Sequence, residues 1–210
     1  MAFGAGVLIS AVSYELIFEA VRMAKRTGFP AFGLFAGAFT FYFTEKLIVR
    51  FGARNPMKIG APAHSSLVIP MVLAIVLDGV PESIVIGLGI LKESTVSPVM
   101  LLAVFISNLP EAIAGTTGMK ADGWSRRRII SLWVFIALIC SIASVAGYSL
   151  FSTASPHWLA FVQAFAGGAI LIMLANSMMP EAYEHGGKLA GVFTVLGFFV
   201  SVAMVVLENS

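Results

Sequence analysis

Two carboxylates lie four residues apart, with a proline between them, in the segment LDGVPESIVIG at residues 77–87. They belong to Asp78 and Glu82, and no other charged side chain occurs in the run 65–91 around them. A spacing of four places both side chains on one face of a helix. Carboxylates on a shared face can bind a cation or pass protons.

The next apolar run, residues 96–119, contains a similar group of polar side chains. Ser107 lies four residues before Glu111 and Asn108 lies three residues before it, so all three share one helical face. Asp78, Ser107 and Asn108 lie close to the midpoints of their runs. We therefore expect the oxygen atoms of the two helices to lie at one depth.

Each of the two runs also has a proline inside its polar group, Pro81 in the first and Pro110 in the second. A proline within a helix lacks an amide donor and bends the helix, which displaces the carbonyl four residues earlier. The displaced carbonyls are those of Leu77 and Ile106. Each offers one more oxygen to a bound cation.

The composition indicates that these helices cross a membrane. Hydrophobic residues make up 59% of the 210 residues and charged residues only 11%, which is too apolar for one soluble core. Seven runs are long enough to cross the hydrocarbon layer as helices, and no soluble domain fits between them. We expect a single transmembrane domain over residues 1–210, with spans near 1–20, 29–48, 65–91, 96–119, 129–151, 158–179 and 189–207. The partner is then the lipid bilayer, and the net charge of +2 does not indicate nucleic-acid binding.

The basic residues predict the orientation, because alternate loops lie on opposite sides of the membrane. One side has Lys46, Arg50, Arg54, Lys58, Lys120, Arg126, Arg127, Arg128 and Lys188; the other has Arg22, Lys25, Arg26 and Lys92. The richer side should be cytoplasmic. The sequence therefore predicts a multi-pass protein of the plasma or inner membrane, with its C-terminus outside.

The mid-membrane carboxylates favour a function over simple helix packing. Polar residues such as Ser107 and Asn108 often join membrane helices, and for those two alone packing is a sufficient explanation. A charged group at mid-membrane costs about 2.5 to 3.5 kcal/mol, and the two runs have no basic residue at that depth. A mobile cation, either a divalent metal or protons, would compensate the charge.

An internal repeat also suggests a transporter. A shift of 162 positions aligns AFGAGVLISAVSYELIFEA at 2–20 with AFAGGAILIMLANSMMPEA at 164–182 without a gap. The first and sixth spans must run in opposite directions. Inverted repeats of this kind are common in secondary transporters.

These motifs resemble the ZIP (ZRT/IRT-like) family of divalent metal transporters. LDGVPES is similar to the fourth-helix motif HNxPEG, SNLPEA to its fifth-helix partner, AFGAGVLISA to the second helix, and AFAGGAILIMLANSMMPEA to the seventh. The resemblance, to a bacterial or archaeal type, implies an all-α fold in which the seven spans match family helices 2 to 8. The family's first helix has no counterpart, because Met1 falls where the second helix would start.

The resemblance implies a metal site and departs from the family at two ligands. A first metal position would be lined by Asp78, Glu82, Ser107 and Glu111, and a second by Asn108 and the two glutamates as bridging ligands. Asp78 stands where the family has a histidine, and Gly79 where it has an asparagine. The family's sixth-helix carboxylate also has no counterpart, which places the second metal position in doubt.

The resemblance favours zinc as the transported ion, and no resident cofactor is expected. The side chains themselves also suit manganese or iron(II), which tolerate all-oxygen sites, and cadmium is open. None of His64, His157 and His185 is expected at the depth of Asp78.

Other acids suggest a path to and from the centre. Glu15 and Glu19 lie toward one end of the first span, and Glu181, Glu184 and His185 lie at the other end of the sixth. Pro180 precedes Glu181, as a further bending proline. For Glu19, Glu184 and His185, simple solvation at an interface is an equal alternative.

Three further features have simpler interpretations. Glu45 beside Lys46 is expected to form an ordinary ion pair. GLFAG at 33–37 fits close helix packing, either within the chain or at a homodimer face. Cys140 is expected to serve only in packing.

The sequence therefore predicts uptake of a divalent metal into the cytoplasm. The alternative is a proton-coupled carrier of a small organic solute, in which the same carboxylates relay protons. An enzyme is not expected, because the chain has no HExxH motif and no Ser/His pair at one depth.

Overall fold

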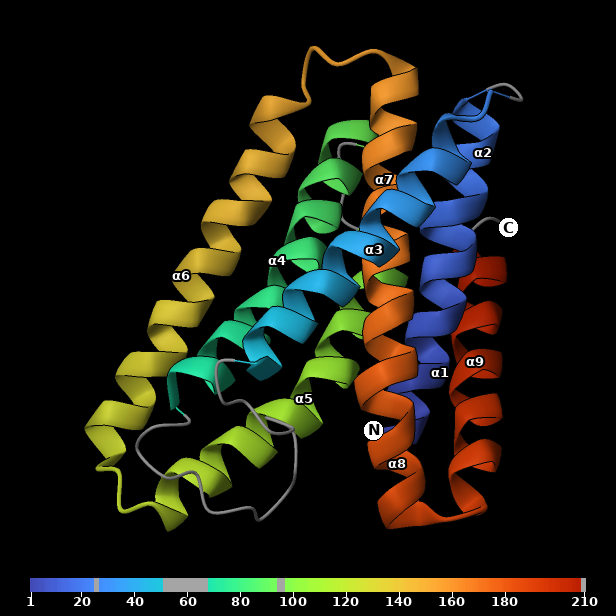
Figure 1. The fold of residues 1–210 in the computed structure, drawn as a ribbon. Coiled ribbons are helices and arrows are strands. Elements are labelled where there is room, and N and C mark those ends of the chain that lie inside the picture. The colour runs from blue at the N-terminus through green and yellow to red at the C-terminus, as the bar shows by residue number, and fades with distance from the viewer. Residues whose placement is uncertain (25–26, 51–67, 94–96, 209–210) are drawn as a thin grey trace.

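The computed structural model describes residues 1–24, 27–50, 68–93 and 97–208, and within these ranges the regular structure is entirely helical. Seven helical rods run through it (Figure 1). Five rods are α3 (Phe29–Arg50), α4 (Val68–Glu93), α5 (Pro98–Ala121), α6 (Arg126–Leu150) and α9 (Leu189–Glu208). The other two contain a π-helix: α1 (Ala2–Ala11), η1 (Val12–Phe18) and α2 (Glu19–Met23); and α7 (Pro156–Met173), η2 (Leu174–Met178) and α8 (Met179–Gly186). The chain is an all-α, multi-pass membrane protein.

Seven rods correspond to the seven predicted spans, with ends that differ by a few residues. The largest difference is in the sixth rod, which continues through Pro180 to Gly186, beyond the predicted end at 179. Among the described residues, five rods are long and apolar enough to cross a membrane, and α3 and α4 are not among them. Successive rods alternate in direction (Figure 1).

This alternation brings the ends of distant helices to the same end of the bundle. The described basic residues of the richer group occur where α3 and α5 end, where α6 begins, and between α8 and α9. The end of α5, the start of α6 and the connection between α8 and α9 lie at the lower end in Figure 1, while α3 runs toward that end and stops higher up. Most of the described basic residues of the richer group therefore lie toward one end of the bundle, and the assignment of that end to the cytoplasm stays a prediction.

Glycines set the closest helix contacts. α3 packs along α7, α1 along α9, and α4 along α6. A side chain at Gly87 of α4 would overlap the Ser144 carbonyl of α6, and one at Gly147 of α6 would meet the Ile84 carbonyl of α4. Small residues let helix backbones approach closely in this way.

The GLFAG glycines make contacts within the chain. Gly33 and Gly37 lie against the carbonyls of Phe161 and Phe165 on α7. Their backbone is covered by the protein's own helix, so the interpretation of GLFAG as a homodimer face is wrong. The homodimer itself stays a prediction, without this motif as its basis.

The two π-helices begin at equivalent positions of the internal repeat. η1 begins at Val12 and η2 begins at Leu174, and these positions differ by the shift of 162 that aligns the two sequence segments. α1 and α7 run in opposite directions (Figure 1). A π-turn requires an inserted residue and is uncommon, which makes its recurrence at equivalent positions informative.

Helix contacts repeat with the π-helices. Gly6 lies against the Thr194 carbonyl, and Gly168, which is 162 positions later, lies against the Leu34 carbonyl, 160 positions before Thr194. The reverse contacts correspond under the same two shifts: Gly197 with Phe3, and Gly37 with Phe165. The α1–α9 pair is thus an inverted copy of the α7–α3 pair.

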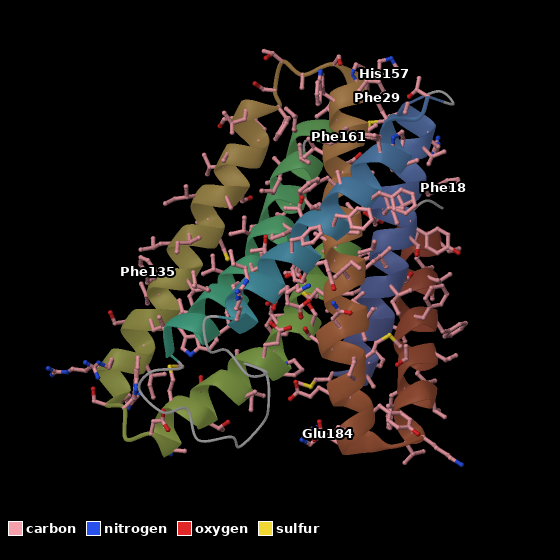
Figure 2. The ribbon with its side chains drawn as sticks, viewed as in Figure 1. Phe18, Phe29, Phe135, His157, Phe161 and Glu184 are labelled. Atoms are coloured by element: carbon pink, nitrogen blue, oxygen red, sulfur yellow. The ribbon has the colours of Figure 1, made fainter. Side chains whose placement is uncertain are left out.

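The packed core lies between α1, α5 and α7, and the outer surface of the bundle is apolar. Core side chains include Leu8, Val12 and Ile170, all fully or nearly fully buried. Phe18 and Phe135, on opposite flanks, point outward and are 56% and 54% exposed (Figure 2). Cys140 of α6 packs in a smaller apolar cluster with Ile75 and Ile136, as expected for a packing residue.

Candidate metal centre

Five polar residues of α4 and α5 form what we call the central site: Asp78, Glu82, Ser107, Asn108 and Glu111. A hydrogen bond joins the helices directly, since Asn108 Nδ2 donates to Glu82 Oε2 at 2.6 Å. The Ser107 hydroxyl lies near the Glu82 carboxylate and donates to the Val104 carbonyl at 3.0 Å. The helical spacing therefore predicted correctly that the two polar faces meet.

The Asn108 amide is held in one orientation. Its Nδ2 donates to Glu82 and also to the Val104 carbonyl, at 2.8 Å, so both amide hydrogens are used. The Oδ1 atom is left as an acceptor that can face a cation. The amide thus links the two helices while keeping an oxygen ligand available.

Burial of these polar side chains costs the protein folding free energy. Glu82 and Ser107 are each 1% exposed, and Asp78 and Glu111 are each 5% exposed. Glu111 Oε2 is buried without a hydrogen-bond partner. A buried, unsatisfied polar atom costs about 1 to 3 kcal/mol, and more if charged, unless a ligand satisfies it.

Among the residues that the structure describes, no basic side chain forms a salt bridge with these carboxylates. Within the described part of the chain the salt bridge is the exposed Arg22–Glu19 pair, with an N–O distance of 3.6 Å, and it lies in α2. Asp78 interacts electrostatically with Glu111, Glu82 and Glu45, which are all acidic. The acidic side chains of the centre repel one another, and the N-terminal ammonium of Met1 interacts with Glu111.

The carboxylates interact electrostatically but do not converge into one compact group of ligands. Glu111 interacts electrostatically with Glu82 on one side and with Glu181 on the other. In the residues that the structure describes, no group of three His, Cys, Asp or Glu side chains converges closely enough to hold a metal ion. A metal here would need the Ser107 and Asn108 oxygens, water, or a closer approach of α4 and α5.

The prolines lie inside continuous helices. α4 continues through Pro81 and α5 through Pro110. Gly4 of α1 lies against the Ile106 carbonyl, four residues before Pro110, and a side chain there would make a tight contact with it. This carbonyl therefore faces α1, whereas the sequence predicted a free oxygen ligand.

Gly79 packs against α6. A side chain there would come within 3.0 Å of Cys140 Sγ on α6. Residue 79 thus faces α6, the helix on which the sequence has no acid. The second metal position implied by the resemblance therefore lacks an asparagine at residue 79 and an acid on α6.

Of the predicted path residues at the lower end, Glu181 lies nearest the centre. It is 7% exposed and interacts electrostatically with Glu111. His185 is exposed, with its Nδ1 atom 3.0 Å from the Glu181 carbonyl oxygen. Glu184 lies at the lower end of α8 and is exposed (Figure 2). The sequence grouped these three, and the structure separates the buried acid from two surface residues.

The two acids of the first rod also differ in their surroundings. Glu15 lies within η1 and is partly buried, whereas Glu19 pairs with the exposed Arg22. His157 stacks on Phe29 at the upper end of α7, with ring centroids 5.6 Å apart (Figure 2). It lies away from the centre, as expected. His64 lies outside the described residues.

Glu45 is a functional candidate that the sequence analysis misassigned. The predicted pair with Lys46 is wrong, because Glu45 accepts hydrogen bonds from Asn176 and Ser177 of η2, while Lys46 Nζ lies 5.9 Å from the Tyr42 ring. Adjacent residues on a helix point in different directions, which should have counted against the pair. The true partners are 131 and 132 positions away and leave no local signal.

Comparison with known proteins gives one relevant similarity. A search against protein-family models finds no match. The chain is 21% identical over 182 residues to a protein of Arabidopsis thaliana named "Putative zinc transporter At3g08650". The match covers 86% of this chain and 29% of the length of that protein. It is consistent with metal transport and gives no residue-level assignment.

Proposed function

We propose that this protein is a ZIP-like transporter that carries a divalent metal cation, most favourably zinc, across the membrane into the cytoplasm. The observation that carries the proposal is the central site itself. Three carboxylates, each at least 95% buried, line two hydrogen-bonded helices, and one carboxylate oxygen has no partner. A mobile cation would remove the repulsion and satisfy that oxygen.

The donor set suits a divalent cation better than a monovalent one. Asp78, Glu82 and Glu111 supply negative charge, and Ser107 and Asn108 complete the shell with neutral oxygens. Hard divalent ions prefer such ligands, and zinc accepts carboxylates although it favours nitrogen and sulfur. Similarity to a protein named as a zinc transporter supports zinc, while the ligands leave manganese, iron(II) and cadmium open.

The helix contacts support transport by alternating movement of the outer helices against the α4–α5 pair. Glycine contacts join α1 to α9 and α7 to α3. At these contacts the two backbones are too close for a side chain to fit between them. These inverted copies form a natural unit that can adopt two opposite orientations. Movement of that unit past α4 and α5 would expose the central site to each side in turn.

A calorimetric titration tests the proposal. The protein is purified in detergent and titrated with zinc, manganese, iron(II) and cadmium, and compared with Glu82→Ala combined with Glu111→Ala. Loss of tight binding in the double variant supports the assignment and ranks the ions. Equal binding by both proteins, or no binding by the intact chain, contradicts it.

A second function, a proton-coupled carrier of a small organic solute, has one observation in its favour. Among the described residues no three acids converge on one point, while Glu111 interacts electrostatically with both Glu82 and Glu181, as acids of a proton relay would. In that case proteoliposomes would take up an organic solute down a proton gradient without any metal. Metal-dependent uptake that saturates would exclude this alternative.

A further inference from the structure

Basic side chains gather where α5 ends and α6 begins. Four exposed residues, which we call the basic turn, lie here: Lys120 in the last turn of α5, and Arg126, Arg127 and Arg128 in the first turn of α6. With Asp122 as the one acid, the segment 120–128 has a net charge of +3. Among the described residues, none of the four basic side chains forms a salt bridge. The basic turn is therefore a concentrated positive surface.

The backbone of this connection is held by its own hydrogen bonds. Gly123 N donates to the Lys120 carbonyl at 3.1 Å, and Ser125 Oγ accepts from Arg128 N at 3.4 Å. Gly123 has a φ of 78°, which glycine adopts without strain. The basic side chains thus extend from a defined turn.

Trp124 places the basic turn at the surface of the membrane. Its ring is partly buried against an apolar cluster that includes Met119 and Ile129. The Arg128 guanidinium lies 5.0 Å from the centroid of the same ring. Tryptophan is enriched where the hydrocarbon layer meets water, so the arginines should lie at the level of the lipid headgroups.

The outer face of α6 continues from the basic turn as an apolar surface. Arg127, Ile130 and Val134 are spaced by three and four residues, so they share one helix face. Ile130 is 49% and Val134 is 53% exposed, while other residues of α6 pack along α4. A guanidinium followed by an apolar face matches a phospholipid, whose phosphate accepts paired hydrogen bonds from arginine.

We propose that the basic turn binds the phosphate of an anionic phospholipid, with an acyl chain along the outer face of α6. Juxtamembrane groups of basic residues attract anionic lipids. A zwitterionic lipid fits less well, because its ammonium group would meet the same arginines. The bound lipid holds the ends of α5 and α6 at the headgroup layer, whether or not the protein transports a metal.

Trp124 can report directly on the neighbouring lipid, since the chain has only three tryptophans. Trp133→Phe combined with Trp158→Phe leaves Trp124 as the one fluorophore. In phosphatidylcholine proteoliposomes, a small fraction of brominated phosphatidylglycerol should quench Trp124 more than an equal fraction of brominated phosphatidylcholine. Salt should reduce this preference. The matched reporter Trp158, at the other end of the bundle, should be quenched equally by both lipids.

Two charge variants of the Trp124 reporter test the basic turn itself. Replacing its three arginines by glutamine should remove the preference for phosphatidylglycerol. The control removes the same charge from scattered exposed positions and should keep the preference: Arg22→Gln, Arg50→Gln and Lys188→Gln. All six positions are exposed, so folding should not change.

Calorimetry of the full chain in detergent gives the affinity. Dioctanoyl phosphatidylglycerol should bind about 10- to 100-fold more weakly to the variant without the three arginines than to the control variant. Equal quenching of Trp124 by the two brominated lipids, or equal loss of binding in the two charge variants, overturns the proposal. Displacement of the lipid by an equal concentration of inorganic phosphate would overturn it too, since the site would then bind free phosphate.

Discussion

Replacing Asn108 by alanine should weaken cation binding without unfolding the protein. The substitution removes the amide that donates to Glu82 Oε2 at 2.6 Å, and also the Oδ1 atom that can face the cation. The Glu82 carboxylate is 1% exposed, so water cannot easily replace the lost donor. The change therefore acts on the geometry and on the charge balance of the central site together.

The size of the effect follows from the type of hydrogen bond. A hydrogen bond to a charged group contributes about 1.5 to 3 kcal/mol, and each 1.4 kcal/mol corresponds to a tenfold change in a binding constant. If the amide holds Glu82 in its binding position, Asn108→Ala should weaken zinc binding about 10- to 150-fold. The lower limit applies if a water molecule enters the space that the amide leaves.

Calorimetric zinc titration in detergent measures this change, and Thr117→Ala is the control. Thr117 lies on the same helix but is exposed, and its hydroxyl donates to its own helix at the Ile113 carbonyl. The control should bind zinc like the unaltered protein. Affinity that is unchanged in Asn108→Ala, or that falls equally in Thr117→Ala, would refute the role of the amide in the central site.

Three further predictions concern packing and transport. Gly168→Ala should destabilise the protein by about 1 to 3 kcal/mol, because the added methyl group overlaps the Leu34 carbonyl, whereas Gly191→Ala, which has open space around it, should stabilise α9 by about 0.5 to 1 kcal/mol. Thermal unfolding in detergent compares the two, and equal midpoints would contradict the close α3–α7 contact. Trp133→Phe should lower stability by about 1 kcal/mol, since it removes the 2.9 Å hydrogen bond from Trp133 Nε1 to Thr116 Oγ1 that joins α5 and α6; an unchanged unfolding midpoint would count against this bond. Glu111→Ala should abolish saturable metal uptake in proteoliposomes at unchanged membrane expression, and normal uptake would remove Glu111 from the central site.

Local periodicity was sufficient to predict the contact between the polar faces of α4 and α5. The spacings of three and four among Ser107, Asn108 and Glu111 define a helix face, and equal depth in neighbouring antiparallel runs brings that face to Glu82. The hydrogen bond between Asn108 and Glu82 confirms this contact. The helix periodicity and the membrane geometry together left few other ways for α4 and α5 to pack.

The Glu45 contact could not be predicted in this way. Its partners lie in a different helix, 131 and 132 positions along the chain, and their spacing carries no periodic signal. The π-helix that presents Asn176 and Ser177 is also invisible to a 3.6-residue pattern, because the inserted residue shifts the faces of the helix after it. Only the tertiary packing of α3 on α7 brings these side chains together.

The internal repeat is also weak in the sequence and clearer in the structure. Five identities between 2–20 and 164–182 are weak evidence in an apolar, glycine-rich chain. The equivalent starts of η1 and η2, and the exchange of contacts between Gly6 and Gly168, depend on backbone geometry. Backbone geometry is retained when side chains diverge, so the structure strengthens a relation that the sequence only suggests.

The most direct test of the proposed function is zinc titration of the purified protein beside the combined Glu82→Ala and Glu111→Ala variant. We expect saturable, tight zinc binding to the intact chain and its loss in the variant, with both proteins equally helical by circular dichroism. Zinc binding of the same affinity in both proteins, or no zinc binding to the intact chain, would contradict a metal site between α4 and α5.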